Sequence, residues 1–196
     1  MIVLASGSAT RRAMLEHAGV EFVVDTSPVD EAAVKAAMRE ETGNAARVAE
    51  VLAELKATKV SARHPGVIVI GADQMLDCDG EWFDKPESPA AARRQLACLR
   101  GKIHRLTSSV VAVRDGKRIW HHTEQAKLTM RRFSDAFLDG YVEKAGAGVL
   151  SSVGAYQLEG LGAQLFMVVE GDHFTILGLP LLALLDFLRE YGELLP

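Results

Sequence analysis

Seven residues near the N-terminus, Ser6-Gly7-Ser8-Ala9-Thr10-Arg11-Arg12, have the composition of an anion-binding turn. They lie between an apolar run at Ile2–Ala5 and a helical pattern over Thr10–Ala18. Free backbone N–H groups and the positive end of a helix dipole favour anions at such a place. Ser6 and Ser8 add hydroxyl donors, and Arg11 or Arg12 adds a planar fork that fits a phosphate. An ordinary strand-to-helix turn capped by Ser8 would use the same residues, and the segment matches neither GxGxxG nor a Walker loop.

A second candidate is Gly71-Ala72-Asp73-Gln74, which directly follows the continuous apolar run Val67–Ile70. Such a run predicts a buried strand, and α/β proteins place ligands at the carboxyl ends of these strands. An acidic residue there could also cap a turn. We favour a functional role for Asp73, because a carboxylate at the end of an apolar strand needs a partner.

Three further charged residues are weaker candidates by themselves. Lys85 precedes Pro86 and would be a cation on a rigid stem, although an exposed lysine in a turn is the commoner case. Lys56 lies near Leu52 and Leu55 on a helical face, where most lysines extend to water. Glu31 begins a helical pattern and could simply complement the helix dipole.

Composition excludes several classes of protein. The 196 residues carry a net charge of −4 without a large basic segment, so nucleic acid is not expected as a partner. No run of about 18 apolar residues predicts a membrane span, and the N-terminus does not resemble a signal peptide. Cys78 and Cys98 lack metal-ligand spacing and are expected to be free thiols in the cytoplasm. The six histidines form no HExxH-like pair.

The elements that must position these residues alternate between strands and helices. Hairpins interrupt the alternation at Asp79-Gly80 and Asp115-Gly116, which favours a mixed α/β sheet over a purely parallel one. No linker or repeat divides the chain, so residues 1–196 are predicted to be a single domain. Strands are expected at Ile2–Ala5, Val20–Val24, Val67–Ile70, Met75–Cys78, Glu81–Phe83, Ile103–Arg114, Lys117–Met130, Leu165–Val169 and His173–Ile176. Helices are expected at Thr10–Ala18, Glu31–Glu41, Ala45–Ala62, Ser88–Leu99, Ser134–Glu143 and Pro180–Tyr191, with a loop at Gly146–Gly162.

Taken together, eight segments resemble the successive motifs of the Maf family. They are LASGSATRRAML, VDE, LAELKA, VIGADQ, DKPES, LRGKIH, GAYQLEGLGA and GLPL, in that order between about residues 2 and 190. The resemblance implies an elongated mixed sheet flanked by helices, with two lobes around a nucleotide cleft, akin to inosine triphosphate pyrophosphatases. It also implies hydrolysis of a nucleoside triphosphate to the monophosphate and pyrophosphate with Mg²⁺ or Mn²⁺, and a homodimer.

Matched to the family motifs, each candidate residue receives a role. Asp73 corresponds to the proton acceptor, and Glu31 with Asp73 corresponds to the acidic pair that holds the metal. The residues that correspond to the substrate-binding set are Ser6, Ser8, Arg11, Lys56 and Lys85. Whether Asp73 is a base, a metal ligand or both is open at this stage.

Three positions bear on the choice of base. Family members that act on thymidine and uridine triphosphates usually have Arg, Thr and Gln where this chain has Thr10, Gln74 and Glu159. Gln74 and Glu159 instead resemble the subfamily that takes 7-methylguanosine triphosphate, although that subfamily tends to have Trp at the Thr10 position. The alternatives are a pyrimidine triphosphate pyrophosphatase and a non-catalytic nucleotide-binding regulator of cell division.

Overall fold

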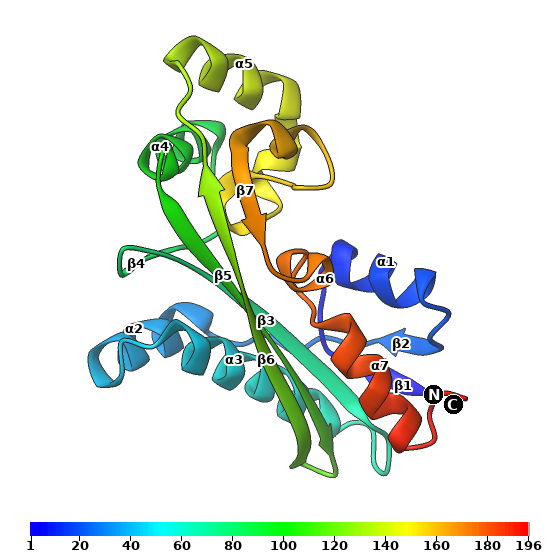
Figure 1. The fold of residues 1–196 in the computed structure, drawn as a ribbon. Helices are drawn as coiled ribbons and strands as arrows, with labels where there is room; N and C mark the ends of the chain where they lie inside the picture. Colours follow the sequence, from blue (N-terminus) through cyan, green and yellow to red (C-terminus); the bar gives the residue numbers. More distant parts are fainter. Residues whose placement is uncertain (196) are drawn as a thin grey trace. The chain divides into compact units, whose positions relative to one another are not determined.

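Seven strands form one mixed sheet in the computed structural model of the chain, which describes residues 1–195. Their order is β2-β1-β3-β5-β6-β7, and β4 pairs with β3 outside this path (Figure 1). β1 is parallel to β2 and β3, whereas β4 is antiparallel to β3 and β7 is antiparallel to β6. The strands are β1 Ile2–Leu4, β2 Phe22–Val24, β3 Val69–Cys78, β4 Glu81–Phe83, β5 Ile103–Arg114, β6 Lys117–Met130 and β7 Phe166–Glu170. The predicted mixed α/β class is therefore confirmed.

The chain divides into two compact units, and β3, β5 and β6 contribute residues to both. Unit 1 comprises residues 1–74, 107–124 and 172–196, and unit 2 comprises residues 75–106 and 125–171. The helices of unit 1 are α1 Ala9–His17, α2 Glu31–Glu41, α3 Ala45–Ser61, α6 His173–Ile176 and α7 Leu181–Glu190. Those of unit 2 are α4 Pro89–Leu99, α5 Asp135–Ala145 and the 3-10 helices η1 Gly146–Leu150, η2 Val153–Ala155 and η3 Leu161–Leu165.

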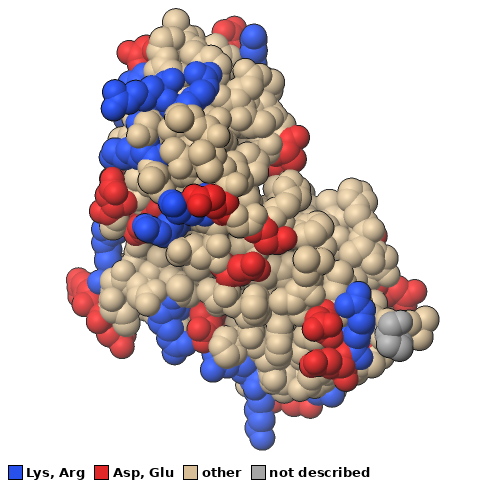
Figure 2. All heavy atoms as spheres, in the orientation of Figure 1, with Lys and Arg blue, Asp and Glu red and all other residues tan. Residues whose placement is uncertain are grey.

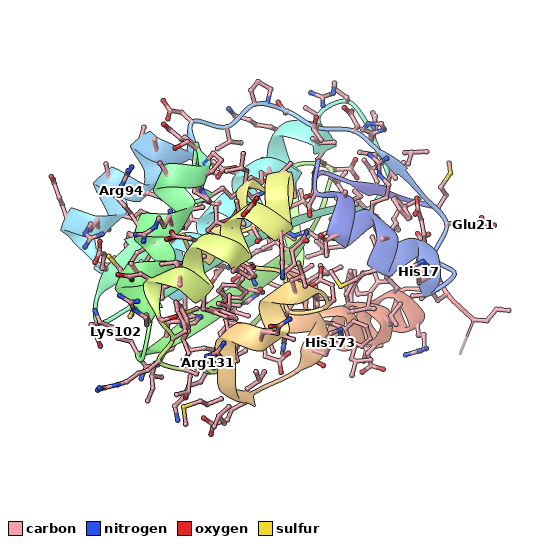
Figure 3. All side chains as sticks on the ribbon, turned by 90° about the horizontal axis from the view of Figure 1, so that it is seen from above. His17, Glu21, Arg94, Lys102, Arg131 and His173 are labelled. Carbon is pink, nitrogen blue, oxygen red and sulfur yellow. The ribbon has the colours of Figure 1, made fainter. Side chains whose placement is uncertain are left out.

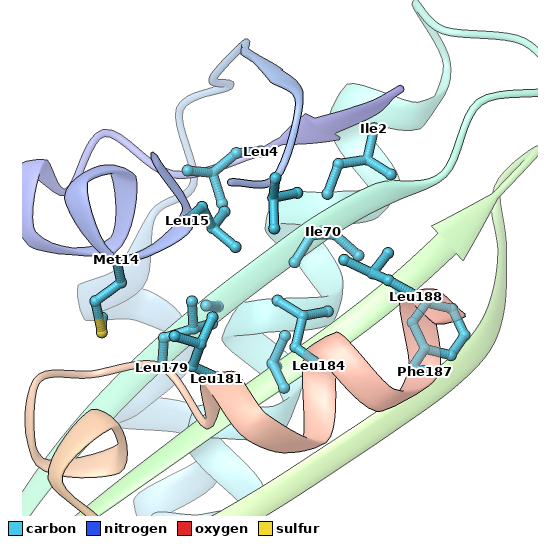
Figure 4. Close-up of a cluster of buried hydrophobic side chains, with 14 of the residues drawn as sticks. Ile2, Leu4, Met14, Leu15, Ile70, Leu179, Leu181, Leu184, Phe187 and Leu188 are labelled. Atoms are coloured by element: carbon cyan, nitrogen blue, oxygen red, sulfur yellow. The ribbon is translucent and has the colours of Figure 1, made fainter. Parts of the chain in front are cut away.

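The core of unit 1 lies on both faces of β1. Ile2 and Leu4 pack in one cluster with α1 and α7, where Leu15 and Leu184 are fully buried (Figure 4). Val3 belongs to a second cluster. Because side chains alternate along a strand, this division means that apolar groups cover both faces. Because both faces of β1 are buried, all of its residues are apolar, which explains the continuous apolar run at the N-terminus.

Two tight turns are as the Asp-Gly pairs predict. Asp79, Gly80, Asp115 and Gly116 all have positive φ, between 51° and 83°. Both central residues of a type I′ hairpin turn require this conformation, which Gly and Asp tolerate better than most residues. The Asp79-Gly80 turn joins β3 to β4, and the Asp115-Gly116 turn joins β5 to β6.

The C-terminal region differs from the prediction in three places. The strand expected at His173–Ile176 is wrong, because these residues form α6, where the Asp172 side chain accepts a hydrogen bond from the Thr175 amide at 2.7 Å. The loop expected at Gly146–Gly162 contains the short helices η1 and η2. Helix α7 begins after Pro180, which is its N-cap rather than part of its first turn.

Ion pairs of unit 2 involve α4, α5 and the residues that flank them. On the face seen in Figure 2, Lys and Arg side chains gather over these helices with acidic side chains beside them. Arg93 is paired with Asp139 at 2.5 Å and Arg100 with Asp135 at 2.7 Å. None of the described helices combines the length and apolar character that crossing a lipid bilayer demands.

We expect the free energy of unfolding to fall in acid, because unit 2 contains a buried histidine, His104. His104 has its Nε2 2.7 Å from the Tyr156 hydroxyl, and its Nδ1 has no hydrogen-bond partner among the described residues. Burial lowers the pKa of His104 from 6.5 to about 4. Between these values the unfolded chain binds more protons than the folded one, so stability is expected to fall as the pH drops through this window, by about 3 kcal/mol in all.

His104→Gln removes this titration, so its stability is expected to depend less on pH. The measurement is the free energy of unfolding by urea at about pH 7 and about pH 5 for both proteins. An equal loss in the variant and the parent would contradict the assignment to His104.

Candidate active site

Two carboxylates and one ammonium group meet in unit 1. Asp73 is 5% exposed and lies within β3, which continues to Cys78, so the expectation that it follows the end of a strand is wrong. The Lys56 Nζ, from α3, lies 2.6 Å from Asp73 Oδ1 and 2.7 Å from Glu31 Oε1. Lys56 is therefore bound to both acidic residues. Most lysines near apolar helix faces extend to water, and Lys56 does not.

Glu31 is the first residue of α2, and the N-cap of this helix fixes its position. The Asp30 side chain caps this helix by accepting a hydrogen bond from the Ala33 amide at 3.0 Å, which places Glu31 in the first turn. Partial burial raises the pKa of Glu31, but the hydrogen bond and charge of Lys56 outweigh it and the net pKa is lowered. The Glu31 carboxylate is thus ionised at neutral pH.

Close packing of α3 on β3 brings Lys56 within reach of Asp73. Gly71 faces the helix backbone, and a Cβ atom added there would overlap the carbonyl oxygen of Ala53. The small residue two positions before Asp73 therefore allows an approach that any other side chain would prevent.

The Ser6-Gly7-Ser8 turn leads into α1 as expected. Ser8 is the N-cap, and its hydroxyl accepts a hydrogen bond from the Arg11 amide at 3.4 Å. The Ser6 hydroxyl accepts from the Ser8 amide at 3.4 Å and from Arg11 Nη1 at 3.1 Å. Neither hydroxyl donates a hydrogen bond to another residue of the described chain, so the turn retains the donors that an anion requires.

The guanidinium of Arg11, which the sequence predicts to bind phosphate, already donates several hydrogen bonds within the protein. Its Nε donates to the carbonyl oxygen of Gly178 at 2.8 Å, and its Nη1 donates to that of Ala72 at 2.9 Å. Burial lowers the pKa of Arg11, and the charges of Asp73 and Glu31 oppose this effect. Since an arginine stays protonated, the guanidinium is a fixed positive charge that joins three segments. Its Nη2 donates to no atom of residues 1–195 and can donate to a ligand.

Gln74 has a side-chain orientation that its neighbours determine. Its Nε2 lies 3.1 Å from Ser108 Oγ, 3.2 Å from the Thr175 carbonyl and 3.0 Å from the Ile176 carbonyl. Ser108 already donates its hydrogen to the Thr175 carbonyl at 2.8 Å, so all three neighbours are acceptors. The amide nitrogen must therefore face them, and Oε1 is left as an acceptor for another group.

The residues that support Arg11 and Gln74 are not predicted by the sequence. The Gly178-Leu179-Pro180-Leu181 segment precedes and begins the last helix, and its Gly178 carbonyl also accepts a hydrogen bond from Arg11. Gly178 has φ of +102°, which glycine adopts readily. No local signal distinguishes Ser108 or Thr175 from other buried polar residues of the sheet.

The other predicted site residues are Thr10, Lys85 and Glu159. Thr10 is half-buried in the first turn of α1. Lys85 follows β4 and Glu159 lies in the turn before η3, and both are exposed residues of unit 2. Their roles in binding and base selection stay predictions.

The acidic pair has the donor chemistry of a magnesium site completed by substrate. Asp73 Oδ2 is buried without a hydrogen-bond partner among the described residues. Mg²⁺ is commonly held by one or two carboxylates together with phosphate oxygens and water. In residues 1–195 no three His, Cys, Asp or Glu side chains gather as a cation site. His17 at the end of α1 and His173 at the start of α6 are thus not part of such a group (Figure 3).

Comparison with known proteins finds relatives that match nearly the whole chain. The relatives include a "Nucleoside triphosphate pyrophosphatase" of Paramagnetospirillum magneticum, 71% identical over 99% of this chain and 100% of the relative. A protein of the same name from Rhodospirillum rubrum is 52% identical over 99% of this chain and 96% of its own length. A "7-methyl-GTP pyrophosphatase" of Brucella abortus is 50% identical over 96% of this chain and 94% of the relative. The family model described as "Maf-like protein" matches residues 1–191, so the chain belongs to the Maf-like family.

Proposed function

We propose that this chain is a nucleoside triphosphate pyrophosphatase that hydrolyses the bond between the α and β phosphates. The observation that carries the proposal is the buried Asp73 carboxylate, joined to Glu31 through Lys56 in the same unit as the anion-suited turn at Ser6–Ser8. A protein that only binds polyphosphate has little reason to place two carboxylates beside its cations. The names of the 71% and 52% identical relatives support the same activity.

Asp73 is proposed as the proton acceptor. A water oxygen attacks the α-phosphorus in line, the bond from the α-phosphorus to the bridging oxygen breaks, and pyrophosphate leaves with that oxygen. The proton of the attacking water passes to Asp73, whose Oδ2 has no other partner among the described residues. General-base catalysis of this kind typically contributes about 10²–10⁴-fold.

A divalent cation, Mg²⁺ or Mn²⁺, is proposed as the cofactor. Glu31 and Asp73 would hold it, and the bound ion would neutralise charge that develops on the phosphate oxygens. The hydroxyls of Ser6 and Ser8 and the free amide groups of the turn would bind the phosphates. Arg11, Lys56 and Lys85 would offset the charge of the pyrophosphate leaving group.

The base is proposed to be guanine-like, with 7-methylguanosine triphosphate as the nearest candidate. Glu159 offers a carboxylate that can accept from both the N1–H and the 2-amino group of a guanine, and Gln74 Oε1 offers a further acceptor. The Brucella relative named for 7-methyl-GTP supports this choice at 50% identity.

The test is pyrophosphate release from a panel of canonical and modified nucleoside triphosphates, with Mg²⁺, with Mn²⁺ and with a chelator. We expect metal-dependent release, fastest with a guanine-type base. Thr10→Arg combined with Glu159→Gln is expected to shift the ratio of kcat/KM toward thymidine and uridine triphosphates, by about tenfold or more. Binding without pyrophosphate release from any nucleotide would contradict the enzymatic proposal, and an unchanged ratio would contradict the specificity proposal.

We also propose the cytoplasm as the location and a homodimer as the assembly. Cys78 and Cys98 are both free thiols, which suits a reducing compartment. The homodimer is the family's expected assembly. Cell fractionation and sedimentation equilibrium test these two points.

A further inference from the structure

The ammonium group of Lys56 lies between the two carboxylates that are proposed to hold a divalent cation. Its Nζ is within 2.7 Å of one oxygen of Asp73 and one oxygen of Glu31, and its side chain is 16% exposed. An ammonium group so placed offsets one of the two negative charges of the acidic pair while no substrate is bound. It also repels any second cation at the same carboxylates, since like charges at contact distance in a partly buried site interact strongly.

The ammonium group does not satisfy the whole pair. Asp73 Oδ2 has no hydrogen-bond partner among the described residues. Water cannot easily replace that partner, because the Asp73 side chain is only 7% exposed. Buried carboxylate oxygens are nearly always paired, and an unpaired one in a native protein indicates a missing ion, water or ligand. The acidic pair is thus built to receive a further positive group.

Local charge explains why that group would not bind to the free protein. The negative charges of Asp73 and Glu31 are balanced by Lys56 and by Arg11, whose positive charge acts on both carboxylates. Lys35 adds a further positive charge, with its Nζ 4.0 Å from Glu31 Oε2. A divalent cation would therefore enter a site of no net negative charge. A triphosphate changes this balance, because it brings several negative charges to which the flexible lysine stem can turn.

We propose that Lys56 holds the cation position in the nucleotide-free protein and moves its ammonium group from the carboxylates to the phosphates when substrate binds. This exchange rests on the proposed function and adds to it that metal and nucleotide bind together. The nucleotide-free enzyme then binds divalent cations weakly, and free metal does not occupy the site before substrate arrives.

The test is the affinity of the nucleotide-free protein for Mn²⁺, followed by electron paramagnetic resonance of the free ion. Lys56→Gln is expected to bind Mn²⁺ at least tenfold more tightly than the parent, because it removes the competing charge. Lys56→Arg retains that charge and is expected to bind as weakly as the parent. Lys59→Gln is the matched control, since Lys59 lies on the same helix but donates to the Pro28 carbonyl at 2.9 Å.

A second set of variants tests whether Asp73 and Glu31 bind the additional Mn²⁺. Adding Asp73→Asn or Glu31→Gln to Lys56→Gln is expected to abolish it, with folding checked by thermal unfolding of each variant. If Lys56→Gln bound Mn²⁺ no more tightly than the parent, or if the gain survived both additions, the exchange would be refuted. The measurement uses no nucleotide, so it can fail while pyrophosphate release is observed, and it can succeed if that activity is absent.

Discussion

Asp73→Asn is expected to lower kcat for pyrophosphate release by about 10²–10⁴-fold. The amide keeps the shape of the carboxylate and can still accept a hydrogen bond from Lys56, which now lies 2.6 Å from Oδ1. It cannot take a proton from water, and it is a poorer ligand for a divalent cation. The measurement is steady-state kinetics with the preferred nucleotide over a range of Mg²⁺ concentrations.

The metal dependence separates the two roles of Asp73. If it acts mainly as a ligand, raised Mg²⁺ restores much of the activity, whereas a lost proton acceptor leaves kcat low at saturating metal. Asp77→Asn is the matched control, because Asp77 lies on the same strand and its carboxylate accepts a hydrogen bond from the Gly80 amide at 3.4 Å. Retention of more than about a tenth of kcat in Asp73→Asn would rule out the proposed base.

Gly71→Ala is expected to destabilise the protein by about 3 kcal/mol or more. The φ of Gly71 is not in the left-handed region, so the reason is steric. The added methyl group would overlap the Ala53 carbonyl oxygen and lie 3.0 Å from the Ala57 Cβ. Because Ala53 contributes a backbone atom, α3 must shift as a whole and would carry Lys56 away from Asp73.

Urea unfolding and pyrophosphate release measure this effect together. Gly140→Ala is the control, because Gly140 lies in α5 and an added Cβ there meets no atom within 4 Å. That substitution is expected to be neutral or slightly stabilising, since Ala favours helix by about 1 kcal/mol. Equal unfolding midpoints for Gly71→Ala and the parent would show that β3 and α3 do not approach as closely as described.

Local patterns predicted most elements of the fold. The hairpins at Asp79-Gly80 and Asp115-Gly116 follow from the positive φ that their turns require, and helices α4 and α5 follow from their serine caps, Ser88 and Ser134. These features depend on residues a few positions apart, so they can be inferred from composition and spacing. Where a short apolar run fits both strand and helix, as at His173–Ile176, the local pattern failed and the Asp172 cap decided for helix.

The candidate site could be named from its motifs but not assembled from them. Residue types and family motifs identify Asp73, Glu31 and Lys56 as a set, and nothing in the sequence says that the lysine lies between the two acids. That arrangement arises because Gly71 lets α3 pack closely on β3. It is a property of two elements in contact.

The hydrogen bonds that fix the Arg11 guanidinium also arise from contact between distant segments. Its two carbonyl partners, Ala72 and Gly178, are 61 and 167 positions away along the chain. A backbone carbonyl is present at every residue, so sequence carries no mark of which ones will accept. Amino-acid types set which charges are available to bind a triphosphate, while the packing of distant segments decides which atoms of those side chains are still free to do so.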